Sequence, residues 1–157
     1  MDATPARTWM IRWLLALCAL HVLAGALLPW LGGGALLDGY HRGIEAAFWP
    51  DGAPAGTRAL DGWWLALFGP TVQAMAIWMG ALVWLGGRLR EARIWLWLMA
   101  GLLVWAPQDM LVSLRADYWP HVWIDLAALA AMLPPLWCLW RRDRTVPAAA
   151  RLQEVRA

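Results

Sequence analysis

The chain has 157 residues, of which 62% are hydrophobic and 15% are charged, and its formal net charge is +2. A soluble globular domain carries about 25% charged residues, so this composition excludes an ordinary soluble domain and indicates a protein of the lipid bilayer. The basic residues are all arginines at the ends of long apolar runs. This placement is a topology signal and argues against nucleic acid as a partner.

The first apolar run covers about residues 9–31. Arg7 and Arg12, followed by a leucine-rich stretch, imitate the start of a signal peptide. The run continues without a break to Leu31, however, and is long enough to cross a bilayer. Leu17 before Cys18 also lacks the small side chain of a lipoprotein cleavage box. We therefore expect an uncleaved transmembrane helix.

The one long connection, residues 32–62, contains a short amphipathic pattern. Leu37, His41 and Phe48 recur at helical spacing, with charged residues elsewhere on the helical wheel. This predicts a short helix on the outer, periplasmic interface that stops at Pro50. In this setting His41 is expected to be a solvated surface residue.

Three further runs, at about residues 63–85, 94–114 and 119–140, have the length of transmembrane helices. Their connections are very short, so consecutive helices should be antiparallel neighbours. The sequence thus predicts an all-α fold, an integral membrane four-helix up-down bundle within residues 1–144. A short, polar cytoplasmic tail follows at residues 145–157.

The distribution of arginines predicts the orientation. Two arginines lie at the N-terminus, three in the turn after the second span and five in the C-terminal tail, against three in the two other loops. Arginine-rich loops stay cytoplasmic, so both termini should be cytoplasmic in a bacterial inner membrane. The exclusive use of arginine suggests a GC-rich bacterial genome. Many of the 15 tryptophans lie at span ends and form an aromatic belt at both interfaces.

Small residues are expected where transmembrane helices touch, because lipid gives no hydrophobic drive for their association. The predicted contact faces are Gly69, Gln73, Ala76 and Gly80 in the second span, and Gly101, Trp105 and Asp109 in the third. Each face should therefore pack against a neighbouring helix.

Polar residues inside apolar spans form the candidate site. They are His21, Gln73, Gln108, Asp109, His121 and Asp125. At about 1.5 Å per residue, Asp109 and Asp125 lie about 9 Å below the outer interface, and His21 and Gln73 about 13 Å. These groups form either a pocket that binds a small amphipathic ligand or relays protons, or hydrogen bonds that hold the helices in register.

The sequence contains little that supports a catalytic, metal or haem site. The sequence lacks a phosphate loop, a nucleophile elbow and a catalytic triad pattern, so no catalytic residue is assigned. It has no CxxC or HxxxH, and only His121 with Asp125 has helical ligand spacing, so no metal site is predicted. Haem ligation by His21 and His121 would need similar depths, yet they differ by about 10 Å. No cofactor is therefore predicted.

The segments APQDML (106–111), HVWID (121–125) and LPPL (133–136) resemble parts of small, uncharacterised bacterial four-helix inner-membrane proteins, some labelled as cell-division proteins. The resemblance implies no catalytic residue. We expect a non-enzymatic accessory or interaction subunit, in contact with lipid and with a membrane-protein partner or another copy of itself. The alternatives are a small-ligand binder or transporter-like protein that uses the polar residues and, third, a haem or redox subunit.

Overall fold

The computed structural model describes residues 5–145 and is helical apart from its turns, which confirms the all-α prediction. Its elements are α1 (Pro5–Leu31), the 3-10 turn η1 (Ala35–Leu37), α2 (Asp38–Phe48), α3 (Thr57–Leu89), α4 (Ala92–Arg115) and α5 (Trp119–Asp143). Helix α2 ends two residues before Pro50. Except for Thr145, the predicted C-terminal tail lies outside the described residues.

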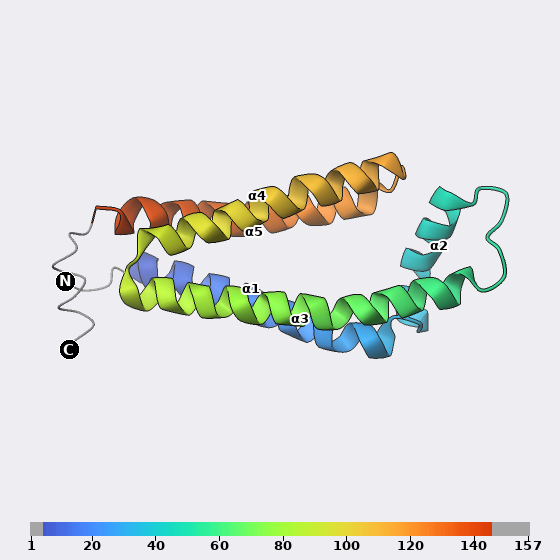
Figure 1. Ribbon diagram of the computed structural model, residues 1–157, viewed down its shortest axis with the longest axis horizontal. Coiled ribbons are helices and arrows are strands. Elements are labelled where there is room, and N and C mark those ends of the chain that lie inside the picture. Colours follow the sequence, from blue (N-terminus) through green and yellow to red (C-terminus); the bar gives the residue numbers. More distant parts are fainter. Residues whose placement is uncertain (1–4, 146–157) are drawn as a thin grey trace.

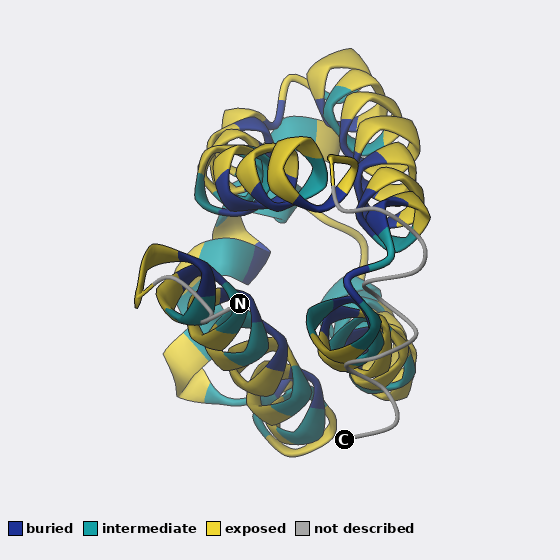
Figure 2. Ribbon diagram, turned by 90° about the vertical axis from the view of Figure 1, so that its left-hand side faces the viewer, coloured by how far each residue is buried: buried dark blue, intermediate teal, exposed yellow. Residues whose placement is uncertain are grey.

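Four helices are long and apolar enough to cross a membrane, namely α1, α3, α4 and α5. Each is longer than the span predicted from hydropathy, because polar residues at the ends continue the helix; α3, for example, begins at Thr57. Only 17% to 28% of the most apolar stretch of each helix is buried. Most residues of these helices are therefore exposed or only partly buried, as the colours of Figure 2 show, which is expected for a multi-pass membrane protein whose solvent is lipid.

The four long helices are arranged as two pairs (Figure 1). Helix α1 packs along α3, and α4 packs along α5. The pairs meet near the α3–α4 turn and separate toward α2, which lies across the opposite end (Figure 1). We call these two ends of the molecule the turn end and the α2 end.

Two glycines allow α1 and α3 to approach closely. A Cβ atom on Gly25 would lie 2.6 Å from the carbonyl oxygen of Gly69, and one on Gly69 would lie 2.6 Å from that of Gly25. On the same side of α3, Ala76 is buried and Gly80 faces Cys18 of α1. The small-residue face predicted for the second span is thus a helix contact, where packing stabilises the pair.

The predicted contact face of the third span is wrong for Gly101 and Trp105. A Cβ atom on Gly101 would meet nothing within 4 Å, and Trp105 is 44% exposed. Helix α4 instead packs through the next stripe of its surface, which includes Trp95, Leu102 and Ala106. Apolar residues cover every side of this helix, so hydropathy could not tell the buried stripe from the lipid-facing one.

The apolar core that joins the two pairs lies in the half next to the turn end. It consists of Met10, Leu14, Val83, Trp95, Leu98, Met99, Leu102, Met132, Leu136 and Leu139, drawn from all four long helices. Trp95 is fully buried, and its ring lies 2.9 Å from the position that a Cβ atom on Gly86 would take. The missing side chain at Gly86 therefore makes room for this tryptophan beside the α3–α4 turn.

Candidate functional site

A buried ion pair at the turn end connects all four long helices. Arg7 of α1 donates hydrogen bonds to both carboxylate oxygens of Asp143 in α5, at 3.2 and 3.0 Å. Trp95 of α4 donates to the same carboxylate at 2.9 Å. Arg7 also donates to the carbonyl oxygens of Gly86 and Gly87 in α3, at 3.5 and 3.0 Å. We call these five residues the turn-end clamp.

The turn-end clamp has a structural role. Arg7 is 7% exposed and Asp143 is 1% exposed. A buried ion pair of this kind is tolerated only when further hydrogen bonds satisfy both ions, and here Trp95 and two carbonyl groups supply them. From the sequence alone, Arg7 was assigned only a role in topology, because its partner lies 136 residues away.

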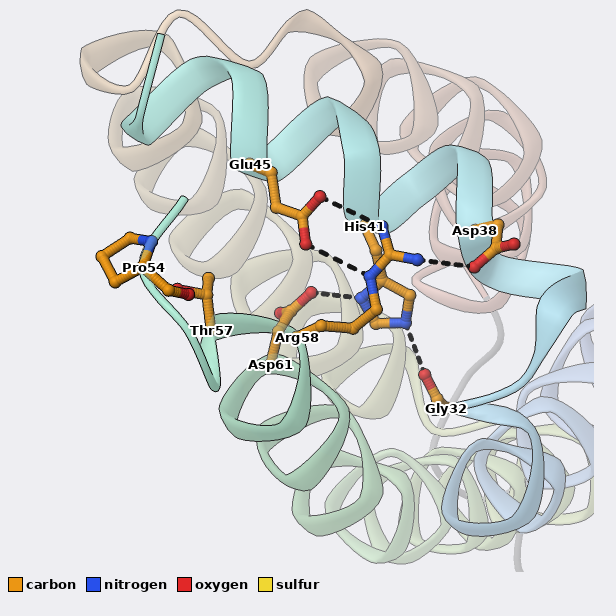
Figure 3. A network of polar contacts seen from close by, with 8 residues as sticks. All are labelled: Gly32, Asp38, His41, Glu45, Pro54, Thr57, Arg58 and Asp61. Carbon is orange, nitrogen blue, oxygen red and sulfur yellow. Dashed lines mark hydrogen bonds and ion pairs between the residues drawn. The ribbon is translucent and has the colours of Figure 1, made fainter. Parts of the chain in front are cut away.

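At the α2 end, His41 fixes α2 to the neighbouring helices (Figure 3). Its side chain is 1% exposed, so the prediction of a solvated His41 is wrong. Nδ1 is hydrogen-bonded to the carboxylate of Asp61 in α3, and Nε2 lies 2.6 Å from the carbonyl oxygen of Gly32 after α1. Each ring nitrogen of His41 therefore has a polar partner, one from α3 and one from the end of α1.

Arg58 adds a second connection between α2 and α3 (Figure 3). It donates to both carboxylate oxygens of Glu45, at 3.2 and 3.0 Å, and to Asp38 at 2.8 Å. The charged side of the amphipathic α2 thus faces α3. We call His41, Asp61, Gly32, Arg58, Asp38 and Glu45 together the α2 network. Arg58 is 41% exposed, so its ion pairs contribute less than the buried contacts of His41.

Another side of α2 contacts the α4–α5 turn through aromatic rings. The ring centroid of Tyr40 lies 6.0 Å from that of Tyr118 and 5.7 Å from that of His121. Tyr118 and His121 meet edge to face at 4.9 Å. A Cβ atom on Gly43 would lie 2.9 Å from the Tyr118 ring, so glycine permits this approach. Helix α2 therefore links the two helix pairs at the end where they separate.

These tyrosines lie in a negative electrostatic environment. Burial raises the pKa of Tyr40 to about 12, and the charges of Asp61 and Asp109 contribute in the same direction. Burial likewise raises the pKa of Tyr118, with a further contribution from Asp61. Burial is thus the main cause of both shifts, and the nearby acidic residues add to it.

The carboxyl groups of Asp109 and Asp125 lie beside each other below these rings. Asp125 is 2% exposed, and its Oδ2 atom has no hydrogen-bond partner. One turn along α5, Nδ1 of His121 lies 3.2 Å from the hydroxyl of Ser113 in α4. We call Asp109, Ser113, His121 and Asp125 the carboxylate cluster. Between residues 5 and 145, neither of its aspartates forms an ion pair.

The structure brings together three of the six residues expected in the polar site, namely Asp109, His121 and Asp125. It does not bring the other three to them. His21 is exposed and bonds to the Leu17 carbonyl of its own helix at 2.7 Å, and Gln108 is exposed and donates to Val104 at 2.8 Å. Gln73 packs against Gly25 in the α1–α3 contact. Equal depth along the helices was therefore insufficient to predict which side chains meet, because the two helix pairs diverge at this level and the side chains point in different directions.

The carboxylate cluster can be compared with the requirements of a metal or haem site. In the described residues, no group of three or more His, Cys, Asp and Glu side chains could hold a metal ion. His21 and His121, the pair weighed for haem ligation, make separate contacts, with Leu17 and Ser113 respectively. No protein-family model, curated protein or solved structure matches the chain.

Proposed function

We propose that this chain is a non-enzymatic, multi-pass protein of the bacterial inner membrane that acts as an interaction subunit. In this proposal both termini and the turn end are cytoplasmic, the four spans form an up-down bundle, and α2 lies on the periplasmic interface. The arginine distribution supports this orientation. The occupant of the interaction surface would be a transmembrane helix of another membrane protein.

The outward face of α4 is the observation that carries this proposal. Gly101, in the middle of the helix, has no side chain to cover the backbone, and a Cβ atom at this position would meet nothing within 4 Å. Small residues in transmembrane helices are typical of helix contacts, since they let two backbones approach closely. Gln108, on the same side of α4, is exposed and bonds only within its own helix, to Val104. An amide at this depth suits an interhelical hydrogen bond.

An apolar groove next to this face gives the partner further space. It has a volume of about 560 Å³ and is lined by Leu96, Met99, Ala100 and Leu103 of α4 and by Leu133, Pro134 and Trp137 of α5. Its lining suits the apolar side chains of a helix that packs through Gly101.

Site-specific crosslinking tests the interaction surface. A photo-crosslinking amino acid at Val104 should crosslink to one defined membrane protein in native membranes, whereas the same group at Ile77, an equally exposed position on α3, should not. Gly101→Leu should abolish the crosslink. Gly39→Leu is the matched control, because a Cβ atom at Gly39 also meets nothing within 4 Å. Crosslinks from Val104 that survive Gly101→Leu would refute the surface, and a crosslink to a second copy of this chain would refute a heterologous partner.

Reporter fusions test the topology. Fusions after Arg90 and after Arg144 should report a cytoplasmic location, and an insertion near Ala53 should report a periplasmic one. A periplasmic signal after Arg144 would require an odd number of spans and would overturn the arrangement.

A second candidate function is the binding of a small amphipathic ligand by the carboxylate cluster. The unpartnered Oδ2 atom of the buried Asp125 favours it, since buried polar atoms in proteins almost always have a partner. If the cluster only holds α4 and α5 in register, Asp125→Leu should lower the thermal stability without any change linked to a ligand.

A further inference from the structure

Asp109 and Asp125 of the carboxylate cluster differ from the other acids described below in forming no ion pair with any residue between 5 and 145. Asp143 is paired with Arg7, and Asp61 with His41. The half-exposed acids of α2 are paired with Arg58. Asp109 and Asp125 lie beside each other instead. Two neighbouring carboxyl groups inside an apolar helix pair are stabilised by a positive charge placed between or above them.

The unpaired Oδ2 atom of Asp125 is a second indication of a ligand, independent of the missing ion pair. It is buried, it belongs to a side chain that is 2% exposed, and it accepts no hydrogen bond from residues 5–145. Leaving a buried acceptor unpaired is unfavourable, and a donor brought by a ligand would remove that penalty. A donor that also carries a positive charge would form a charge-assisted hydrogen bond with the carboxylate, which is roughly twice as strong as a neutral one.

Aromatic rings lie near the two aspartates, on the side of the α4–α5 turn. Tyr40 and Tyr118 pack around His121, which is one helical turn from Asp125. The faces of such rings attract organic cations, and tyrosines beside carboxylates are the usual surroundings of a bound ammonium group.

The side chains available at the carboxylate cluster suit an ammonium group better than a metal ion. Calcium and magnesium require about six oxygen ligands, and transition metals prefer three or more side-chain ligands, whereas the described chain offers no such group. An ammonium group needs only two or three acceptors and tolerates aromatic neighbours. Because Asp125 lies about 9 Å below the end of α5 along an apolar helix, the molecule that carries this group must itself be lipophilic.

From these observations we propose that the carboxylate cluster, with the rings of Tyr40 and Tyr118, binds a protonated lipophilic amine that enters from the α2 end. The proposal rests on the ligand-binding role given above as the second candidate and is independent of the partner surface on α4. The ammonium group would donate to Oδ2 of Asp125 and to Asp109, and the apolar part of the molecule would lie against the tyrosine rings.

Calorimetric titration of the purified protein in nanodiscs tests the proposal. The probe is protonated 2-phenylethylamine, its neutral counterpart is 2-phenylethanol, and empty nanodiscs correct for partition into lipid. The amine should bind saturably, and the alcohol should bind at least about tenfold more weakly, because it lacks the charge. Equal binding of the two compounds, or no saturable binding of the amine, would overturn the proposal.

Two substitutions locate the bound amine. Asp125→Asn keeps the shape and one hydrogen-bonding oxygen but removes the charge, and should weaken binding at least about tenfold. The matched control is Asp117→Asn in the α4–α5 turn, where the carboxylate accepts only from Trp119, at 3.1 Å; it should bind as the unaltered protein does. Tyr40→Leu should also weaken binding, whereas Tyr40→Phe should keep it. Unchanged affinity of a folded Asp125→Asn protein for the amine would refute this site. The crosslinking experiment from Val104 tests the partner surface on α4 independently of this result.

Discussion

The two ends of this molecule use buried charge in different ways. At the turn end, Arg7 and Asp143 form a closed pair with all their partners in the chain, above an apolar core that all four long helices share. At the α2 end the helix pairs separate, and α2 alone links them, by the α2 network on one side and by tyrosine rings on another. The two ends are thus held together differently: by a closed ion pair and a shared apolar core at the turn end, and by contacts of the short helix α2 at the α2 end.

The largest effect is expected from breaking the turn-end clamp. Asp143→Leu leaves the Arg7 guanidinium buried without a counter-charge, and should lower the free energy of unfolding by about 3–5 kcal/mol. Equilibrium unfolding in mixed micelles, followed by tryptophan fluorescence, measures this loss. The double variant Arg7→Met with Asp143→Leu should recover much of it, because no unpaired charge remains. A single variant as stable as the unaltered protein would mean that the turn end is not the stable end.

A smaller loss is expected where α1 and α3 cross. Gly69→Val pushes a side chain against the carbonyl oxygen of Gly25, and should lower the free energy of unfolding by about 1–3 kcal/mol. Gly101→Val adds the same side chain to α4 where nothing lies within 4 Å, and should change it by less than about 0.5 kcal/mol. Similar losses for both variants would show that the effect does not come from the helix crossing.

A local effect is expected at the α2 network. His41→Ala removes the contacts to Asp61 and to the Gly32 carbonyl, and should lower the free energy of local opening of α2 by about 1–2 kcal/mol. Hydrogen exchange should then accelerate in α2 while the turn end remains protected. Arg42→Ala, at the exposed neighbouring position, should leave the exchange of α2 unchanged. Accelerated exchange at both ends would contradict the separation of the two regions.

The smallest effect at neutral pH is expected for Tyr40→Phe, which removes only a hydroxyl group. The pKa of Tyr40 is raised from 10.0 to about 12, so ionisation favours the open form, where the hydroxyl is solvated. The contribution of this group is complete below about pH 10 and is lost as the pH rises toward 12. The protection of α2 should fall over that range, together with the appearance of tyrosinate absorbance, and Tyr40→Phe should flatten this dependence. An unchanged profile in the variant would assign the alkaline opening to another group.

Sequence reasoning predicted the helices well and the contacts between them less well. The apolar runs located the four long helices, because a span must be apolar over its whole length. The direction in which each side chain points was harder to predict. On α3 the small residues marked the contact with α1, but on α4 Gly101 faces outward, and only packing decides between these outcomes.

The candidate site shows the same limit. Asp109, His121 and Asp125 lie on consecutive helices joined by a tight turn, so their proximity followed from local spacing. His41 and Asp61 escaped notice, because nothing in the spacing of the sequence shows that the two helices they belong to pack on each other. The pairing of Arg7 with Asp143 was equally hidden, since both residues stand among charges at span ends that are usually solvated.

The pairing of the first long helix with the last also sets an order for biosynthesis. Arg7 is synthesised early in translation, whereas its carboxylate partner is made 136 residues later. Until then the guanidinium can bond only to the carbonyl groups of Gly86 and Gly87, which the nascent chain supplies after two of its four long helices. A chain that stops before residue 143 would lack the counter-charge of Arg7, so the ion pair that connects the first and last long helices can form only when the last of them is complete.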